Sequence, residues 1–143
     1  MKLNPWGDLS TSLVVSGREV DAAFLISALQ LDDSGELSSS EGVGVYSGPG
    51  WATLTVDGRN SKSTDEQAAK ILALLSPRKP ALDAMKREGA SVKIDVSGVA
   101  ESGSELRISP NVLAGLSGLG VALTFTTVRA SGDDEEDPLA WLG

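Results

Sequence analysis

Hydrophobic and polar residues follow two different periods along the chain, and these periods predict its secondary structure. Strict alternation at every second position predicts a strand at residues 91–96. Short β-rich runs predict further strands at residues 12–16, 43–47, 51–56, 105–109 and 121–128. Apolar residues spaced three and four apart predict amphipathic helices at residues 19–30, after Ser63, from Pro80 to Gly89 and after Ser109. The turn residues 48–50 separate the second and third strands, so we expect a hairpin there.

Two of the predicted helices begin with recognisable capping residues. Ser63 is followed three residues later by Glu66, the spacing of a capping box, which satisfies backbone N–H groups at the start of a helix. Ser109 precedes Pro110, which gives an N-cap followed by proline at the first helical position. Pro77 ends the helix that starts after Ser63, because proline lacks the N–H that a helix interior requires.

The order of these elements predicts the fold class. The string β-α-β-β-α-β-β-α-β is typical of an α+β protein whose mostly antiparallel sheet carries its helices on one face. Residues 105–109 are expected to pair antiparallel with residues 91–96, and Trp51 is expected in the core. The length of 143 residues suits a single domain, which we place at residues 1–130, with residues 131–143 as a C-terminal tail.

The composition argues against catalysis and metal binding. The chain has neither cysteine nor histidine, so it lacks a thiol nucleophile, the commonest general base and the commonest transition-metal ligand. Ser61, Lys62 and Ser63 bring hydroxyls and an amine together, but neighbouring residues do not orient a nucleophile towards its base. We therefore expect no enzyme activity, no cofactor and no metal site.

The formal net charge of −8 is divided unevenly along the chain. Residues 1–66 carry −6, residues 67–130 carry +3 and residues 131–143 carry −5. An acidic protein is poorly suited to the phosphate backbone of nucleic acids, and its charge favours a basic protein partner instead. The N-terminus lacks the apolar run of a signal peptide, and no stretch is long enough to span a membrane. These features predict a cytoplasmic protein with no membrane partner.

Three groups of charged residues are the candidate binding sites. The loop at residues 32–42 does not have the complete pattern of an EF-hand calcium site. Its carboxylates could instead contact a basic surface on a partner protein; they are Asp32, Asp33, Glu36 and Glu41. The tail combines an acidic run with an aromatic anchor in Asp133, Asp134, Glu135, Glu136, Asp137 and Trp141. The third group is basic and could bind an anion or the acidic tail; it consists of Arg78, Lys79, Lys86 and Arg87. The alternatives are an acidic surface loop, a solubilising terminus and a solvated helix face.

The C-terminal half has apolar residues at spacings seen in a known bacterial family. The pattern comprises Leu82, Met85, Gly89, Val92 and Ile94, then Leu106, Ile108, Ser109, Pro110, Leu113, Leu116 and Leu119. Together with the first strand and helix and the strand that carries Trp51, it resembles the family called domain of unknown function 4279, over about residues 10–128. The resemblance implies a fold but supplies no catalytic motif. Small proteins of this kind are often similar to immunity proteins of bacterial toxin systems.

These observations together lead to two functional hypotheses. We expect a non-catalytic binding protein, such as an immunity or inhibitor protein that neutralises a basic partner, for example a toxin domain, by direct binding. The alternative is a self-associating module, a homo-oligomer in which the acidic tail of one copy docks on another. An association rate that falls steeply with salt would favour the first hypothesis.

Overall fold

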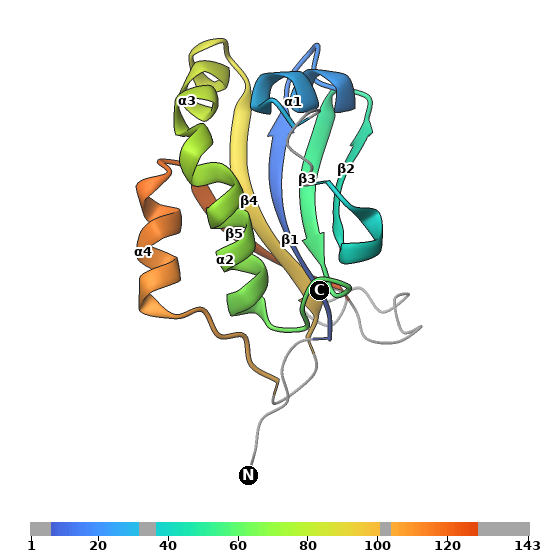
Figure 1. The fold of residues 1–143 in the computed structure, drawn as a ribbon, viewed down its shortest axis with the longest axis vertical. Helices are drawn as coiled ribbons and strands as arrows, with labels where there is room; N and C mark the ends of the chain where they lie inside the picture. The colour runs from blue at the N-terminus through green and yellow to red at the C-terminus, as the bar shows by residue number, and fades with distance from the viewer. Residues whose placement is uncertain (1–6, 32–36, 101–103, 129–143) are drawn as a thin grey trace, which may run out of the picture.

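A five-stranded sheet forms the centre of the protein, with its strands in the order β2-β3-β1-β4-β5. The computed structural model describes residues 7–31, 37–100 and 104–128 (Figure 1). The strands are β1 (Gly7–Ser16), β2 (Val43–Gly48), β3 (Trp51–Asp57), β4 (Ser91–Val99) and β5 (Ala122–Val128). The helices are α1 (Ala22–Leu29), α2 (Thr64–Leu75), α3 (Lys79–Arg87) and α4 (Pro110–Gly118), with short 3-10 turns at Ser39–Glu41 and Ser76–Arg78.

The predicted α+β class with a mostly antiparallel sheet is confirmed. β1 pairs antiparallel with both β3 and β4, and β2 pairs antiparallel with β3 in the expected hairpin. Only β5 is parallel to its neighbour, β4, among the described strands. Figure 1 shows the helices on one face of the sheet, as the sequence predicted.

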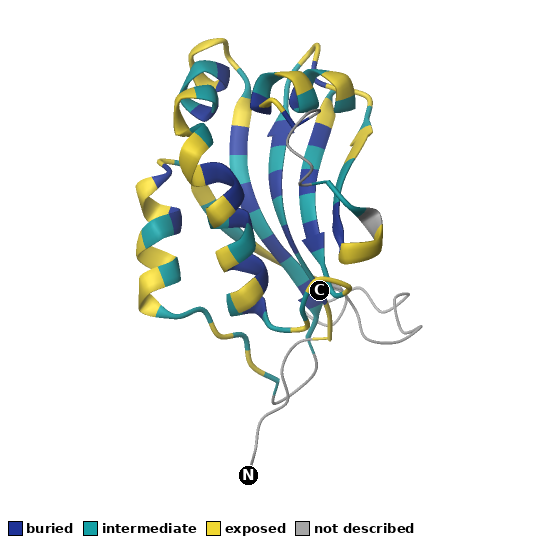
Figure 2. Cartoon of the chain, in the orientation of Figure 1, coloured by how far each residue is buried: buried dark blue, intermediate teal, exposed yellow. Residues whose placement is uncertain are grey.

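Strict alternation along the strands explains why one sheet face is buried. Leu13 of β1 lies opposite Leu54 of β3 and Ile94 of β4, and all three side chains are at most 1% exposed. Figure 2 shows the buried positions recurring at every second residue of these strands. They share one hydrophobic core with buried residues of the helices, such as Leu25 and Ile71, so they face the helix side. The residues between them face the opposite side and are mostly polar.

The predicted N-caps at Ser63 and Ser109 are confirmed, and they fix where α2 and α4 begin. The reciprocal half of the predicted capping box is wrong, because the backbone N–H of Ser63 donates to the Ser61 hydroxyl, while the Glu66 carboxylate accepts that same hydroxyl. The hydroxyl of Ser63 accepts the backbone N–H of Glu66, and that of Ser109 accepts the N–H of Val112. Asp21 caps α1 in the same way through the N–H of Phe24, which starts this helix three residues later than the pattern at 19–30 predicted. Proline lies in the first turn of α3 and of α4.

The predicted antiparallel strand at residues 105–109 is wrong. This segment forms no strand, and its only β feature is an isolated bridge at Glu105. It carries the chain from the end of β4 to α4, whose far end leads into β5, so the unit is a strand–helix–parallel strand crossover. The backbone N–H of Ser109 donates to Asp65 Oδ1 of α2 at 2.7 Å, which holds the start of α4 against the neighbouring helix.

Candidate functional site

The sheet face opposite the helices carries two groups of hydrogen-bonded hydroxyls, and no described helix covers it. The hydroxyls of Ser10 and Ser97 are 3.0 Å apart, and those of Ser12 and Thr55 are 2.8 Å apart. Thr55 also donates to the hydroxyl of Thr53 at 3.1 Å. These bonds cross from β4 through β1 to β3, so the hydroxyls are held in a fixed pattern. We call this surface the open face.

Asp95 provides the carboxylate of the open face. Its Oδ1 accepts the hydroxyls of Thr124 at 2.6 Å and Thr126 at 2.9 Å, both on β5. Lys93 lies two residues earlier on β4 and therefore on the same face. One acid and one base in this part leave the open face close to neutral, with hydrogen-bonding groups as its main chemistry.

Two aromatic residues lie on the open face where β2 and β3 meet. Tyr46 is 45% exposed and Trp51 is 40% exposed, so the prediction that Trp51 lies in the core is wrong. The register places Tyr46 opposite Thr53 and Trp51 opposite Gly48, which puts both rings on the same side of the sheet. A Cβ at Gly48 would be 2.5 Å from Trp51 Nε1, and a Cβ at Gly44 would be 3.1 Å from the Tyr46 hydroxyl. Each ring therefore lies directly against a glycine of β2.

An ion pair adjoins these aromatic residues at the end of β3. Arg59 donates to both carboxylate oxygens of Asp57, from Nε at 3.2 Å and from Nη2 at 2.7 Å. The side-chain hydrogen bond with Arg59 lowers the pKa of Asp57 below its ordinary value of 3.8. The same bond, with a further contribution from Tyr46, raises the pKa of the Arg59 guanidinium. The pair keeps both charges fixed beside the Tyr46 ring.

Replacing Asp57 with asparagine should flatten the pH dependence of stability in acid. Because the pKa of Asp57 is lower in the folded state than in the unfolded chain, the stability it contributes is complete above about pH 4 and is lost as pH falls through the folded pKa. Urea unfolding from about pH 2 to 5 should show a shallower slope for Asp57→Asn. Arg59→Gln should flatten it similarly, whereas an unchanged slope in both variants would contradict this effect.

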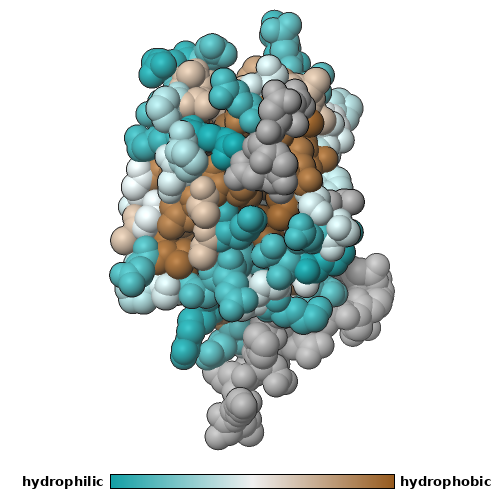
Figure 3. Space-filling view, viewed as in Figure 1, coloured by the Kyte–Doolittle hydropathy of each residue, from teal (hydrophilic) through white to brown (hydrophobic). Residues whose placement is uncertain are grey.

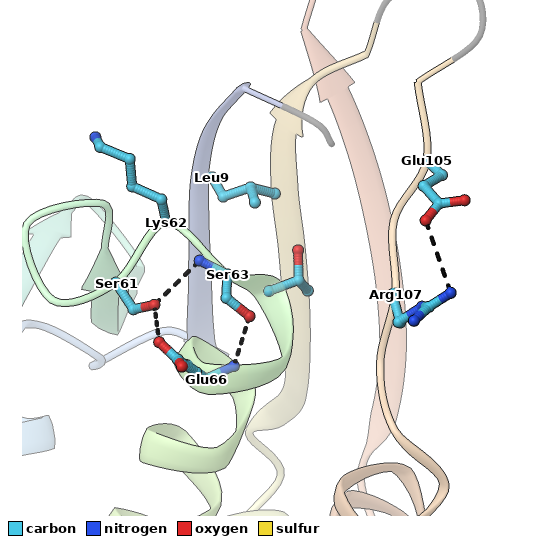
Figure 4. Close-up of a pocket in the computed structure, with 8 residues that line it drawn as sticks. Leu9, Ser61, Lys62, Ser63, Glu66, Glu105 and Arg107 are labelled. Atoms are coloured by element: carbon cyan, nitrogen blue, oxygen red, sulfur yellow. Dashed lines mark hydrogen bonds and ion pairs between the residues drawn. The ribbon is translucent and has the colours of Figure 1, made fainter. Parts of the chain in front are cut away.

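A pocket of about 480 Å³ lies at the N-terminal end of α2 (Figure 4). Ser61 and Ser63 line one side, and Glu105 and Arg107, whose charged atoms are 4.0 Å apart, line the other. The hydroxyl of Ser61 bonds to Glu66, while Lys62 points away from both serines. The structure therefore places no amine against a serine hydroxyl here.

Gln67 forms a buried polar network beneath this pocket. Its side chain is fully buried; it accepts the hydroxyl of Thr11 at 3.2 Å and donates to the carbonyls of Leu9 at 2.9 Å and Ser61 at 2.7 Å. These bonds fix α2 against the edge of the pocket and against β1. The one sequence signal for this role is a polar residue among the apolar positions of α2.

The four basic candidates are not one free cationic patch. Arg78 donates to the backbone carbonyls of Leu29 and Leu74, both at 2.6 Å, and so ties together the C-terminal ends of α1 and α2. Lys79 and Lys86 lie 3.4 and 3.6 Å from the two carboxylate oxygens of Asp83. Arg87 is exposed and forms no ion pair within the described ranges. The helical spacings of Asp83 to Lys79 and Lys86 were the available signal.

Both lysine partners lower the pKa of Asp83. Desolvation raises its pKa, but the hydrogen bonds and charges of Lys79 and Lys86 outweigh that effect and hold the pKa below its ordinary value. Lys86 also donates to the carbonyl of Gly120 at 2.7 Å, just before β5. Lys86 therefore links α3 to the residues just before β5, while Lys79 pairs only within α3 in the described part of the chain.

Most acidic candidates lie outside the described residues. Glu41 is described, and it is exposed in the 3-10 turn before β2. The structure does not describe Asp32, Asp33, Glu36, Asp133, Asp134, Glu135, Glu136, Asp137 and Trp141. The predicted domain boundary between residues 130 and 131 also lies outside the described residues.

Net charge divides sharply between the described residues and the remaining ones. The described residues hold eleven acids and ten bases, a net charge of −1. The remaining residues therefore carry −7 of the total of −8, mostly in residues 32–36 and 129–143. The acidity of this protein is therefore concentrated in residues 32–36 and 129–143, whereas the described part of the chain is almost neutral.

The described ranges offer neither a metal site built from carboxylates nor a helix suited to a membrane. No group of three or more carboxylates is placed to hold a metal ion in that part of the chain. None of its helices has the length and apolar character that crossing a lipid bilayer requires.

Comparison with known proteins gives one match. Residues 14–128 match the model of the family described as domain of unknown function (DUF4279), which agrees with the resemblance found in the sequence. No curated protein and no solved structure matches the chain. The match covers β1 from Val14 onwards and every later described element.

Proposed function

The chain belongs to the DUF4279 family, whose function is unknown, and we propose that it is a non-catalytic binding protein that neutralises a basic protein partner, such as a toxin domain, by direct contact. The observation that carries the proposal is the exposed pair Tyr46 and Trp51 on the open face. Tyrosine and tryptophan are enriched at the centres of protein interfaces because they bury a large area at little entropic cost. The hydroxyls of Thr53 and Thr55, on β3 beside them, supply hydrogen-bonding groups that are already ordered.

The distribution of charge supports a basic partner. The acidity concentrated in residues 32–36 and 129–143 would attract a basic protein over long distances, while the open face would provide the close contacts. In this scheme Asp32, Asp33, Glu36, Glu41 and the acids of the tail act mainly on the association rate. The aromatic pair acts mainly on the dissociation rate.

Affinity capture from the native organism, followed by mass spectrometry, would identify the partner for a quantitative test. The association rate measured by stopped flow should fall by at least about tenfold as ionic strength rises from low to physiological values. The double variant Tyr46→Ala/Trp51→Ala should weaken binding by about thirtyfold, which corresponds to about 2 kcal/mol.

Leu113→Ala is the matched control for this experiment. Leu113 is 46% exposed, like the two aromatic residues, but it belongs to α4 on the helix side of the sheet. Its replacement should leave partner affinity unchanged. The proposed mode of binding would be excluded if the double variant Tyr46→Ala/Trp51→Ala bound the partner as tightly as the wild type. It would also be excluded if the association rate did not change with salt.

A further inference from the structure

In the part of the chain that the structure describes, the strand β5 is an open edge of the sheet. It pairs only with β4 within the described ranges, and its register with β4 runs without a shift from Ala122 to Val128. Its sequence, ALTFTTV, contains no charged residue, no proline and no glycine. Exposed edges of this kind offer a row of unpaired backbone groups to another strand, and most proteins protect them.

The opposite edge strand of the sheet, β2, is partly protected from pairing with another strand. Its first residue, Val43, is also bridged to Ser38, so a neighbouring segment covers the start of this strand. The rings of Tyr46 and Trp51 also lie against its glycines Gly44 and Gly48. β5 is of similar length, but it contains no glycine and pairs only with β4 within the described ranges, so it is the edge that is suited to pairing.

Apolar side chains are exposed beside β5. Phe125 is 50% exposed and Leu113 of α4 is 46% exposed, which makes them two of the four large hydrophobic side chains exposed in the described residues. A cavity of about 170 Å³ lies between α4 and the sheet and is lined by Leu113, Leu116 and Leu123. Figure 3 shows apolar side chains reaching the surface over α4. A strand added to this edge would bury part of this surface.

We propose that the occupant of this edge is a second copy of the chain, with β5 pairing antiparallel to its counterpart about a two-fold axis at Phe125. Phe125 is the middle residue of β5, and a threonine lies on each side of it. The pairing places Phe125 opposite Phe125 of the other copy and Thr124 opposite Thr126. Aromatic pairs and threonine pairs directly opposite each other stabilise antiparallel strands, and a two-fold interface is necessarily self-complementary.

Electrostatics favours the antiparallel arrangement. Residues 129–143 of each copy carry five acids and one base and follow directly after Val128. In the antiparallel pair each Val128 lies opposite Ala122 of the other copy, so the two acidic segments begin about 20 Å apart at about 3.3 Å per residue. That separation exceeds the screening length of about 8 Å at physiological salt. A parallel pair would instead bring both segments to the same end.

Sedimentation of the full-length chain over a wide range of concentration tests this dimer. The wild type should form a dimer whose dissociation constant decreases with added salt, because salt screens the repulsion between two chains of net charge −8. Phe125→Lys and Phe125→Glu should each raise that constant by at least about tenfold, since each places like charges opposite each other. An equimolar mixture of the two variants should recover the dimer, which a folding defect would not do.

Tyr46→Lys is the matched control, because Tyr46 is a similarly exposed aromatic residue on the other edge strand. It should leave the dimer intact. A monomeric wild type, a dimer that survives both Phe125 charge variants, or a mixture that stays monomeric would each overturn the proposal. The dimer is independent of partner binding, which uses the open face and weakens with salt, so the two proposals can fail separately.

Discussion

Replacing Gln67 with alanine is expected to lower the free energy of unfolding by about 3 kcal/mol, a large part of the stability of a domain of this size. The substitution removes the donor for the buried carbonyl of Leu9 and the acceptor for the hydroxyl of Thr11. A buried polar group left without its partner costs about 1–3 kcal/mol, and the lost side-chain volume adds a cavity. The carbonyl of Ser61 is only partly buried, so water can replace its bond more cheaply.

Two further variants separate the contributions of volume and hydrogen bonding. Gln67→Met keeps most of the side-chain volume and removes the hydrogen bonds. It should therefore still lower the free energy of unfolding by most of the amount expected for Gln67→Ala. Thr11→Val removes one hydroxyl and should cost about 1 kcal/mol. Urea unfolding measures all three as a shift in midpoint at constant slope. A loss of less than about 0.5 kcal/mol for Gln67→Ala would show that the network contributes little, as at an ordinary surface site.

The features of the fold that depend on near neighbours in sequence could be predicted. The caps at Ser63 and Ser109 each involve residues three positions apart, and the β2–β3 hairpin has a turn of glycine and proline between two strand patterns. The buried face of β4 follows from its strict alternation. In each case the interacting residues are close along the chain, so the local pattern contains the information.

Features that depend on pairing between distant residues could not be predicted. Residues 105–109 alternate like a strand, but both sides of β4, the strand they were expected to pair with, are taken by β1 and β5. The exposure of Trp51 depends on the register that places Gly48 opposite it. Arg78 looked like part of a cationic cluster because its two acceptors, the carbonyls of Leu29 and Leu74, are backbone groups that no side-chain pattern reveals.

The candidate sites also differ in whether their residues are close together in the sequence or come from separate strands. Charge runs are visible in the sequence, and they led to the acidic candidates in residues 32–41 and 133–137. The open face and the β5 edge are visible only once the strand order is known, because their residues come from separate strands. A binding surface made of scattered serine, threonine and single aromatic residues leaves no compact motif in a sequence.

Replacing Gly42 with alanine is expected to lower the free energy of unfolding by about 3 kcal/mol or more. Gly42 has a φ of +78°, and a Cβ there would lie 2.5 Å from the backbone nitrogen of Asn60 and 2.7 Å from Asp57 Oδ1. A left-handed conformation costs about 1–2 kcal/mol for a residue with a Cβ. The collision with backbone adds to this, because backbone cannot rotate away as a flexible side chain can. The substitution should also disturb the Asp57–Arg59 pair.

Gly89→Ala isolates the conformational part of that cost. Gly89 has a φ of +98°, but a Cβ there would meet nothing within 4 Å, so its replacement should cost only about 1–2 kcal/mol. Comparing the two variants by urea unfolding therefore measures the collision at Gly42 directly. Equal losses would mean that the turn at residues 57–60 moves aside freely. A larger loss at Gly42 would show that this turn is held rigidly beside β2, at the end of the open face where Tyr46 lies.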